Sequence, residues 1–235
     1  MAREGKPLVI YQKRYGGIGD HLVYSGLPSA LKEKYGLEVH ISRQSAFRSG
    51  EVKKFVWNNI PFSDEQGIAM HRPPYKKYKN YNEILFGLFG VTGAPLFSPS
   101  YSPKQWDGVK DKIICDLTFG PSGEHNGYTE PRFREGVLNY LLQYDPKDLM
   151  FLEPKAYGDQ SLLSFVRETI PAPMTAIKDL EELCDVICSA KGRIFLDSGT
   201  KSIAALYGMQ SIVLDAGHAD PFFRYDTNTY HIIRS

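Results

Sequence analysis

Hydrophobic and polar positions along this chain repeat the order strand, turn, helix. The pattern predicts a strand over residues 7–12, a helix over 21–35 and a second strand over 37–42. A strand, a helix and a strand in this order form a βαβ unit, which implies parallel strands and a right-handed crossover. The amino-terminal part of the chain is therefore predicted to be an α/β domain.

The next stretch has a weaker pattern and then a change in composition. Residues 53–58 and 60–62 are predicted to form short strands, and residues 82–89 a short amphipathic helix. Residues 91–107 are rich in proline, glycine and serine, which is typical of a linker between domains. We therefore expect an amino-terminal domain over 1–92, a linker over 93–110 and a carboxy-terminal domain over 111–235.

The second half of the chain alternates short apolar runs with helical patterns. This regular alternation predicts a second doubly wound parallel sheet. The predicted strands are 112–118, 149–152, 174–177, 193–196, 211–215 and 230–233, and the predicted helices are 132–143, 161–169, 180–190 and 202–207.

Composition excludes some classes of partner and site but does not identify a function. The 235 residues are 42% hydrophobic, and 28 Lys and Arg against 27 Asp and Glu give a net charge of +1, so no global charge favours nucleic acid or an anionic membrane. No signal-peptide core and no membrane-length apolar stretch is present, so we expect a soluble, cytoplasmic protein. Cys115, Cys184 and Cys188 lack metal-ligand spacing and are predicted to be buried, reduced thiols.

One local exception interleaves basic and aromatic residues between His71 and Tyr81. Such a composition can follow a phosphate backbone and stack on bases or sugars. It is also typical of a solvated loop. The sequence leaves both interpretations open.

The strongest candidate site is the turn that follows the predicted strand 193–196. Asp197, Ser198, Gly199 and Thr200 stand between this strand and a helix. A helix that begins at the carboxyl edge of a parallel sheet presents unpaired N–H groups and its positive dipole end, which favours phosphate. The competing interpretation is an ordinary helix start with Asp197 or Ser198 as the N-cap.

Two further turns have similar features. Gly17, Gly19 and Asp20 follow the first strand, and glycines there permit a close approach of a ligand to the backbone, although the spacing is not that of a dinucleotide fingerprint. Asp20 is alternatively the N-cap of a helix that starts at His21. The loop 119–131 carries Ser122 and Asn126. Either its backbone amides face an anion, or the loop is only a flexible connection between a strand and a helix.

The order of these motifs resembles the GT-B glycosyltransferases, and specifically the lipopolysaccharide heptosyltransferase family. The matching segments are GIGD at 17–20, LPSALK at 27–32, DLEEL at 179–183, FLDSG at 195–199 and AALYG at 204–208. The chain departs from the family at Ser202, where the family has a histidine, and at Asn126, where its phosphate loop carries a lysine. The amino-terminal half is short, and nothing matches the family's closing helix.

The resemblance implies two Rossmann-like domains facing a cleft, with a reduced amino-terminal domain on the acceptor side and a carboxy-terminal domain that binds a nucleotide sugar. It implies Asp20 as the base that takes the acceptor proton. The amides of the 197–200 turn would hold the diphosphate, with Lys201 and either Arg132 or Arg134 as cations, unless Lys201 points into solvent. The substrate- or donor-binding residues so implied are Gly17, Gly19, Ser122, Asn126, Arg132, Arg134, Glu153, Asp197, Ser198, Gly199, Thr200 and Lys201.

Within this resemblance Glu153 would accept from the nucleotide ribose, or it is an exposed loop glutamate. No DxD sequence occurs in the chain, so we expect metal-independent transfer without a cofactor. Two alternatives remain at this point. One is a DNA-modifying glycosyltransferase of the same fold that binds DNA between His71 and Tyr81, and the other is a noncatalytic protein that binds a nucleotide or a partner.

Overall fold

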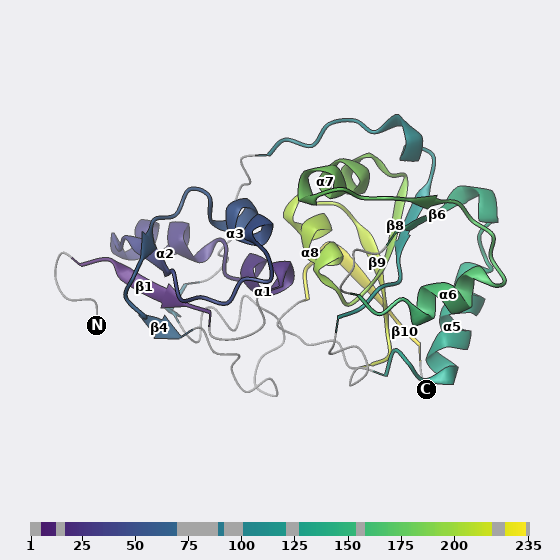
Figure 1. Cartoon of the computed structure of the whole chain (residues 1–235), viewed down its shortest axis with the longest axis horizontal. Helices are drawn as coiled ribbons and strands as arrows, with labels where there is room; N and C mark the ends of the chain where they lie inside the picture. The colour runs from purple at the N-terminus through teal and green to yellow at the C-terminus, as the bar shows by residue number, and fades with distance from the viewer. Residues whose placement is uncertain are drawn as a thin grey trace. The chain divides into compact units, whose positions relative to one another are not determined.

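The computed structural model describes residues 6–12, 17–69, 89–91, 101–120, 127–153, 158–217 and 224–233. The chain divides into two compact units, whose helices and strands are labelled in Figure 1. Unit 1 comprises Met1–Ser100 and Asp220–Arg224, and unit 2 comprises Tyr101–Ala219 and Tyr225–Ser235. Each unit has its own parallel sheet.

Unit 1 is built on a sheet of four strands in the order β3-β2-β1-β4. The apolar run LVIY forms the central strand, and its Val9 and Ile10 are buried. The positive φ of Gly67 (71°) lets the chain pass close to Val9 before β4. The elements of the unit are β1 (Leu8–Tyr11), α1 (Ile18–Leu22), α2 (Leu27–Tyr35), β2 (Val39–Ser42), α3 (Gly50–Trp57), β3 (Phe62–Ser63) and β4 (Ile68–Ala69).

The single helix predicted over 21–35 is wrong, because the structure has two. Helix α1 begins earlier, at Ile18, and ends at Leu22, and α2 begins at Leu27 with Pro28 in its first turn. Proline has no N–H group and a fixed φ, so it fits the start of a helix and not its interior. Gly36 ends α2 in the left-handed conformation (φ 65°), as predicted.

The strand predicted over 53–58 is also wrong, because these residues lie in helix α3 and the turn after it. Ser49 caps this helix, and its hydroxyl accepts a hydrogen bond from the Val52 N–H at 3.3 Å. Val52, Val56 and Trp57 are buried on one helical face. The neighbouring strand β3 comprises Phe62–Ser63 and not 60–62.

Unit 2 is built on a sheet of six parallel strands in the order β10-β9-β8-β5-β6-β7. Every run predicted to be a strand in this half of the chain overlaps one, β10 begins two residues before its predicted run, and the predicted helices are present with shifted ends. The elements are η2 (Asp107–Val109), β5 (Ile113–Asp116), α5 (Pro131–Leu141), η3 (Pro146–Asp148), β6 (Leu149–Leu152), α6 (Ser161–Arg167), β7 (Met174–Thr175), α7 (Leu180–Ser189), β8 (Gly192–Leu196), α8 (Gly199–Leu206), β9 (Ser211–Asp215) and β10 (Asn228–Ile232).

The core of unit 2 lies between its sheet and helices. The central strands are almost continuous apolar runs, as expected for parallel strands that are covered on both faces. Helix α5 contributes Phe133, Val137 and Leu141, spaced four residues apart so that they share one face. Cys115 is buried in this core, and none of the three cysteines forms a disulfide.

The segment that enters unit 2 is fixed along helix α7. The Asp185 carboxylate accepts hydrogen bonds from the Tyr101 hydroxyl and from the Lys104 N–H, both at 2.7 Å. The Trp106 N–H donates to Ser189 Oγ at 2.8 Å. The second half of the predicted linker is therefore packed on unit 2.

Some predictions concern residues that the structure does not describe. The run between His71 and Tyr81 and all but the last residue of the helix predicted over 82–89 lie outside the described residues. In the part of the chain that is described, no helix has both the length and the apolar character needed to cross a membrane.

Candidate functional site

The turn predicted as the strongest site lies at the carboxyl edge of the unit 2 sheet. Strand β8 ends at Leu196, and α8 begins at Gly199 with Ser198 as its N-cap, in extended conformation (φ −131°, ψ 175°). Ser198 Oγ is buried and makes no hydrogen bond with any described residue, so it does not cap the helix. The first N–H groups of α8 have no acceptor within the helix, and such a helix start favours anions.

Thr200 ties this helix start to the neighbouring strand β5. Its hydroxyl donates to Asp116 Oδ2 at 2.5 Å, and both residues are buried. Oδ1 of Asp116 accepts from the N–H and the hydroxyl of Thr118, at 3.0 and 2.6 Å. The Thr200 hydroxyl is therefore engaged in a buried hydrogen bond, and only the backbone N–H of this residue is available to a ligand at the helix start.

Lys201 lies inside unit 2, and the alternative that it points into solvent is wrong. Its Nζ lies 2.6 Å from Asp197 Oδ1, and the two side chains are 1% and 7% exposed. The ammonium also donates to the Tyr230 hydroxyl at 2.9 Å and lies 5.4 Å from the ring centroids of Tyr225 and Tyr230. A contact of Lys201 with a diphosphate stays a prediction, and the structure shows its ion pair with Asp197 and its hydrogen bond to Tyr230.

Tyr128 supports the same turn from the loop after β5. Its hydroxyl accepts a hydrogen bond from the Asp197 N–H at 3.3 Å, and its ring stacks on Phe133 at 5.0 Å between centroids. Burial and the nearby carboxylates of Asp197 and Asp215 raise the pKa of the Tyr128 hydroxyl, which therefore stays protonated. The sequence analysis missed Tyr128, Tyr230 and Asp116; only Asp116, at the end of an apolar strand, carried a usable signal.

The two arginines predicted as alternatives differ in their surroundings. Arg134 lies on α5 and donates from its Nη2 to Ser161 Oγ at 2.9 Å. Arg132, in the first turn of α5, is exposed and makes no hydrogen bond or ion pair within the described residues. Arg132 is thus the arginine whose guanidinium is available to a ligand.

The structure shows fewer contacts, or none, for the remaining residues predicted to bind the donor. Glu153 follows β6, has an exposed side chain and donates its backbone N–H to the Thr175 carbonyl at 2.8 Å. Gly199 is the first residue of α8. Ser122 and Asn126 lie outside the described residues.

In unit 1, Asp20 lies in the first turn of α1. Gly17 is the N-cap of this helix, and its N–H donates to Asp20 Oδ2 at 3.3 Å. The alternative that Asp20 caps a helix starting at His21 is therefore wrong, because Asp20 is the third residue of the helix. Gly19 lies beside it and, like Asp20, is partly exposed.

Gly17 also lies close to the guanidinium of Arg48. A Cβ atom at Gly17 would lie 3.2 Å from Asp20 Oδ2 and 3.8 Å from Arg48 Cζ. The glycine therefore leaves room for a carboxylate and a guanidinium on the same turn. Arg48 is exposed, and the sequence analysis did not identify it.

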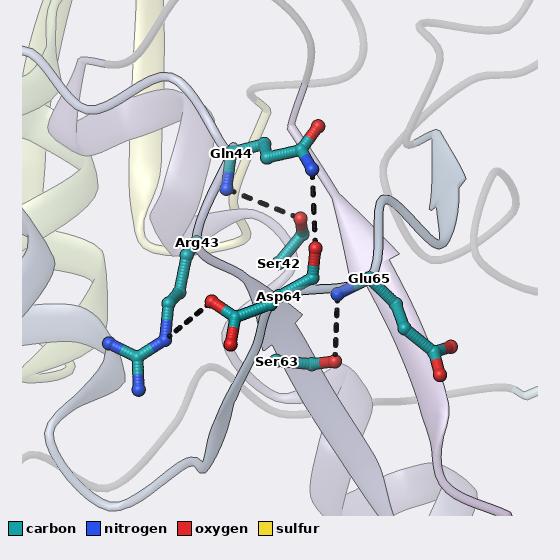
Figure 2. A network of polar contacts seen from close by, with 6 residues as sticks. All are labelled: Ser42, Arg43, Gln44, Ser63, Asp64 and Glu65. Atoms are coloured by element: carbon teal, nitrogen blue, oxygen red, sulfur yellow. Dashed lines mark hydrogen bonds and ion pairs between the residues drawn. The ribbon is translucent and has the colours of Figure 1, made fainter.

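The turns after β2 and β3, at the carboxyl edge of the unit 1 sheet, are fixed by serine hydroxyls (Figure 2). Oγ of Ser42 and of Ser63 each accepts from the N–H two residues further on, at 3.3 and 3.1 Å. Arg43 Nε lies 3.2 Å from Asp64 Oδ1 across the two turns. Both side chains are largely exposed, so this ion pair contributes little to stability.

Metal ligation finds no support in the side chains that the structure describes. Among these residues, no three His, Cys, Asp or Glu side chains are grouped so that they could hold a metal ion. Asp116 and Asp215 end the strands β5 and β9 on either side of β8, but they form no such group.

No family model matches the chain, and no curated protein matches its sequence. Several solved structures, however, are similar to this chain. The iron-containing dodecameric glycosyltransferase TibC of enterotoxigenic E. coli is similar at a TM-score of 0.64 and 13% identity, over 96% of this chain and 62% of TibC. TibC has also been solved with ADP-D-beta-D-heptose.

Two further structures are similar. A glycosyl transferase of family 9 from Veillonella parvula gives a TM-score of 0.54 at 12% identity, over 99% of this chain and 86% of its own. The E. coli heptosyltransferase WaaC with ADP gives a TM-score of 0.51 at 10% identity, over 96% of this chain and 92% of WaaC. The chain spans about three fifths of TibC. The predicted heptosyltransferase-like GT-B fold is confirmed, with a smaller sheet in the amino-terminal unit.

Proposed function

We propose that this protein is a glycosyltransferase that moves a sugar from a nucleoside-diphosphate donor to the hydroxyl of an acceptor. The observation that carries the proposal is the start of α8. An uncapped helix N-terminus lies at the carboxyl edge of a parallel sheet, in a fold that this chain shares with heptosyltransferases over 96% of its length. The nucleotide ligands of TibC and WaaC support a nucleotide sugar as the donor class.

The donor's diphosphate would bind at the first N–H groups of α8. Gly199 and Thr200 would donate from the backbone, and Ser198 Oγ is a buried hydroxyl with no other described partner. Arg132 would add a charge-assisted contact from α5, since Arg134 is engaged with Ser161. Glu153, exposed after β6, would accept from the ribose hydroxyls.

Asp20 would act as the general base. The acceptor oxygen forms a bond to the anomeric carbon of the sugar, the bond from that carbon to the diphosphate oxygen breaks, and the acceptor proton passes to Asp20. The N–H of Gly17 already donates to one oxygen of this carboxylate, which holds it in place in unit 1. The leaving diphosphate would be stabilised by the α8 dipole and by Arg132, without a divalent metal.

The test is release of nucleoside diphosphate, measured by mass spectrometry, from a panel of nucleotide sugars with pooled saccharide acceptors. We expect release from one donor, and a loss of about 10²–10⁴-fold in kcat for Asp20→Asn, which keeps the shape of the side chain. Asp64→Asn is the matched control, because Asp64 is an exposed carboxylate of the same unit.

One outcome would overturn the assignment of the base, and another would overturn the proposed sugar transfer. If Asp20→Asn keeps wild-type turnover, Asp20 is not the base. If no donor is consumed but one raises the melting temperature, the protein binds nucleotides without transferring a sugar. DNA in the acceptor pool tests transfer to a modified base, which would depend on the basic and aromatic run between His71 and Tyr81 and would weaken with salt.

A further inference from the structure

A buried histidine joins three segments of unit 1 next to the proposed base. His21 follows Asp20 on α1 and is 0% exposed. Its ring stacks on Phe47, with the centroids 4.6 Å apart and the planes at 9°, and meets Trp57 edge-on at 6.0 Å. Helix α1 packs against α3, which carries Trp57, and Figure 1 shows the two helices together.

The hydrogen bonds define the protonation of the imidazole. The indole Nε1 of Trp57 lies 3.0 Å from His21 Nδ1, and an indole nitrogen can only donate. Nδ1 must therefore accept, and the ring proton is on Nε2, which donates to the Ala46 carbonyl at 2.9 Å. Burial lowers the pKa of His21 to about 4, partly opposed by the bond to Ala46, so the ring is neutral.

These bonds connect the two chain segments whose charged groups lie beside Gly17. His21 is adjacent to Asp20, and Ala46 is two residues before Arg48. The carboxylate and the guanidinium both approach the position of a Cβ at Gly17, at 3.2 and 3.8 Å. A shift of α1 against the 46–48 segment would separate these two groups.

We propose that His21 is a positioning residue that, held by the Trp57 indole and the Ala46 carbonyl, keeps the Asp20 carboxylate and the Arg48 guanidinium together on the Gly17 turn. This inference rests on the proposed function, because it assigns His21 to the geometry of the proposed base. The alternative is a histidine that stabilises the core of unit 1 and has no effect on the chemistry.

Substitution by phenylalanine separates the two roles. His21→Phe keeps a flat ring against Phe47 but leaves the Trp57 N–H buried without a partner, which destabilises the unit. In the double variant His21→Phe/Trp57→Phe no indole N–H is left without an acceptor, so the part of the lost stability that came from that group should return, less the cost of the smaller ring at the buried position 57. A structural histidine predicts that turnover returns with stability. A positioning histidine predicts that it does not, because the bond from α1 to Ala46 is still missing.

The experiment measures kcat, the KM for the donor and the unfolding midpoint of wild type, both single variants and the double variant. We expect kcat to fall by about 10–100-fold in His21→Phe and in the double variant, since a displacement of about 1 Å can have such an effect. The donor KM should change by less than about threefold, because the proposed donor contacts lie in unit 2. His40→Phe is the matched control in the same unit and should leave kcat unchanged.

The outcomes separate this inference from the proposed function. A stable double variant with wild-type kcat, alongside an inactive Asp20→Asn, would overturn the role of His21 and leave the function intact. Wild-type turnover in Asp20→Asn would remove Asp20 as the base, and no release of nucleoside diphosphate by the wild-type protein from any donor would overturn the proposed function itself. The indole N–H signal of Trp57 in an NMR spectrum tests the bond without activity, since it should be shifted downfield in wild type and not in His21→Phe.

Discussion

The two units stabilise their candidate turns by different kinds of buried polar group. In unit 1, His21 is a neutral ring whose two nitrogens bond to neutral groups. In unit 2, Lys201 and Asp197 form a buried ion pair beside two tyrosines. Removing one partner of a neutral hydrogen bond costs about 1–3 kcal/mol, whereas a buried charge left alone costs about 3–5 kcal/mol. The stability of unit 1 should depend on pH, because His21 is buried as a neutral ring. The stability of unit 2 should depend on both charges, because the loss of Lys201 or Asp197 leaves the other buried alone.

The largest expected effect is in unit 2. Lys201→Met leaves the Asp197 carboxylate buried without its cation, and we expect a loss of about 3–5 kcal/mol in the free energy of unfolding. Asp197→Asn/Lys201→Met should recover most of this loss, because no charge is then buried. Urea unfolding in a Trp57→Phe background follows unit 2 through Trp106, the other of the two tryptophans. A single variant that loses less than about 1 kcal/mol contradicts the buried pair.

The next effect is the pH response of unit 1. Native His21 stays neutral down to a pKa of about 4, whereas in the unfolded chain it takes up a proton near 6.5. The unfolded state therefore binds more protons below 6.5, and stability falls as the pH falls. Between about pH 7 and about pH 5 the loss should be about 2 kcal/mol. Unfolding of a Trp106→Phe background measures it, and the loss should be absent when His21→Phe is added.

A smaller effect distinguishes the two arginines of α5. Arg134→Gln loses the bond to Ser161 Oγ and should cost about 1 kcal/mol of stability, with donor affinity unchanged. Arg132→Gln should leave stability within about 0.5 kcal/mol but weaken donor binding by roughly tenfold. Thermal melts and calorimetric titration with the donor measure both quantities. The reverse result would assign the diphosphate contact to Arg134.

A small change in stability with a larger change in activity is expected at the turn beside Asp20. Gly17 has an ordinary φ of −73°, so Gly17→Ala adds no backbone strain and should change stability by less than about 1 kcal/mol. Its Cβ would nevertheless displace the Asp20 carboxylate, from which it would lie only 3.2 Å away. We expect a clear fall in kcat with little change in the donor KM. Gly50→Ala, where a Cβ meets nothing within 4 Å, is the control and should keep full activity.

The sequence predicted correctly those strands and helix starts that depend on residues near one another in the chain. Apolar runs such as residues 193–196 and 211–215 became strands because each is buried on both faces of a parallel sheet. The position of Ser198 just before α8 followed from the same local order, although its hydroxyl makes no capping hydrogen bond. Residues 53–58 were predicted wrongly because Phe55, Val56 and Trp57 have high strand propensity, and packing of one helical face overrode it.

The candidate site was less predictable, because its contacts join residues far apart in the chain. Lys201 next to a turn suggested a surface cation, and only the tyrosines of β10 and the segment before it show why it is buried. The bond between His21 and Trp57 spans 36 positions and leaves no local pattern. Motif spacing located both turns, but it could not show which side chains contact the protein and which are left for a ligand.

Tyr225 and Tyr230, which cover Lys201, come later in the chain than every other strand of the unit 2 sheet. During synthesis the ribosome releases α8 before these two residues, and until they arrive the ammonium has to stay hydrated. In a nascent chain that stops short of Tyr225, Lys201 lacks the two tyrosines that lie against its ammonium and keeps Asp197 as its partner. The surroundings of Lys201 would therefore be completed only after Tyr225 and Tyr230 have been synthesised.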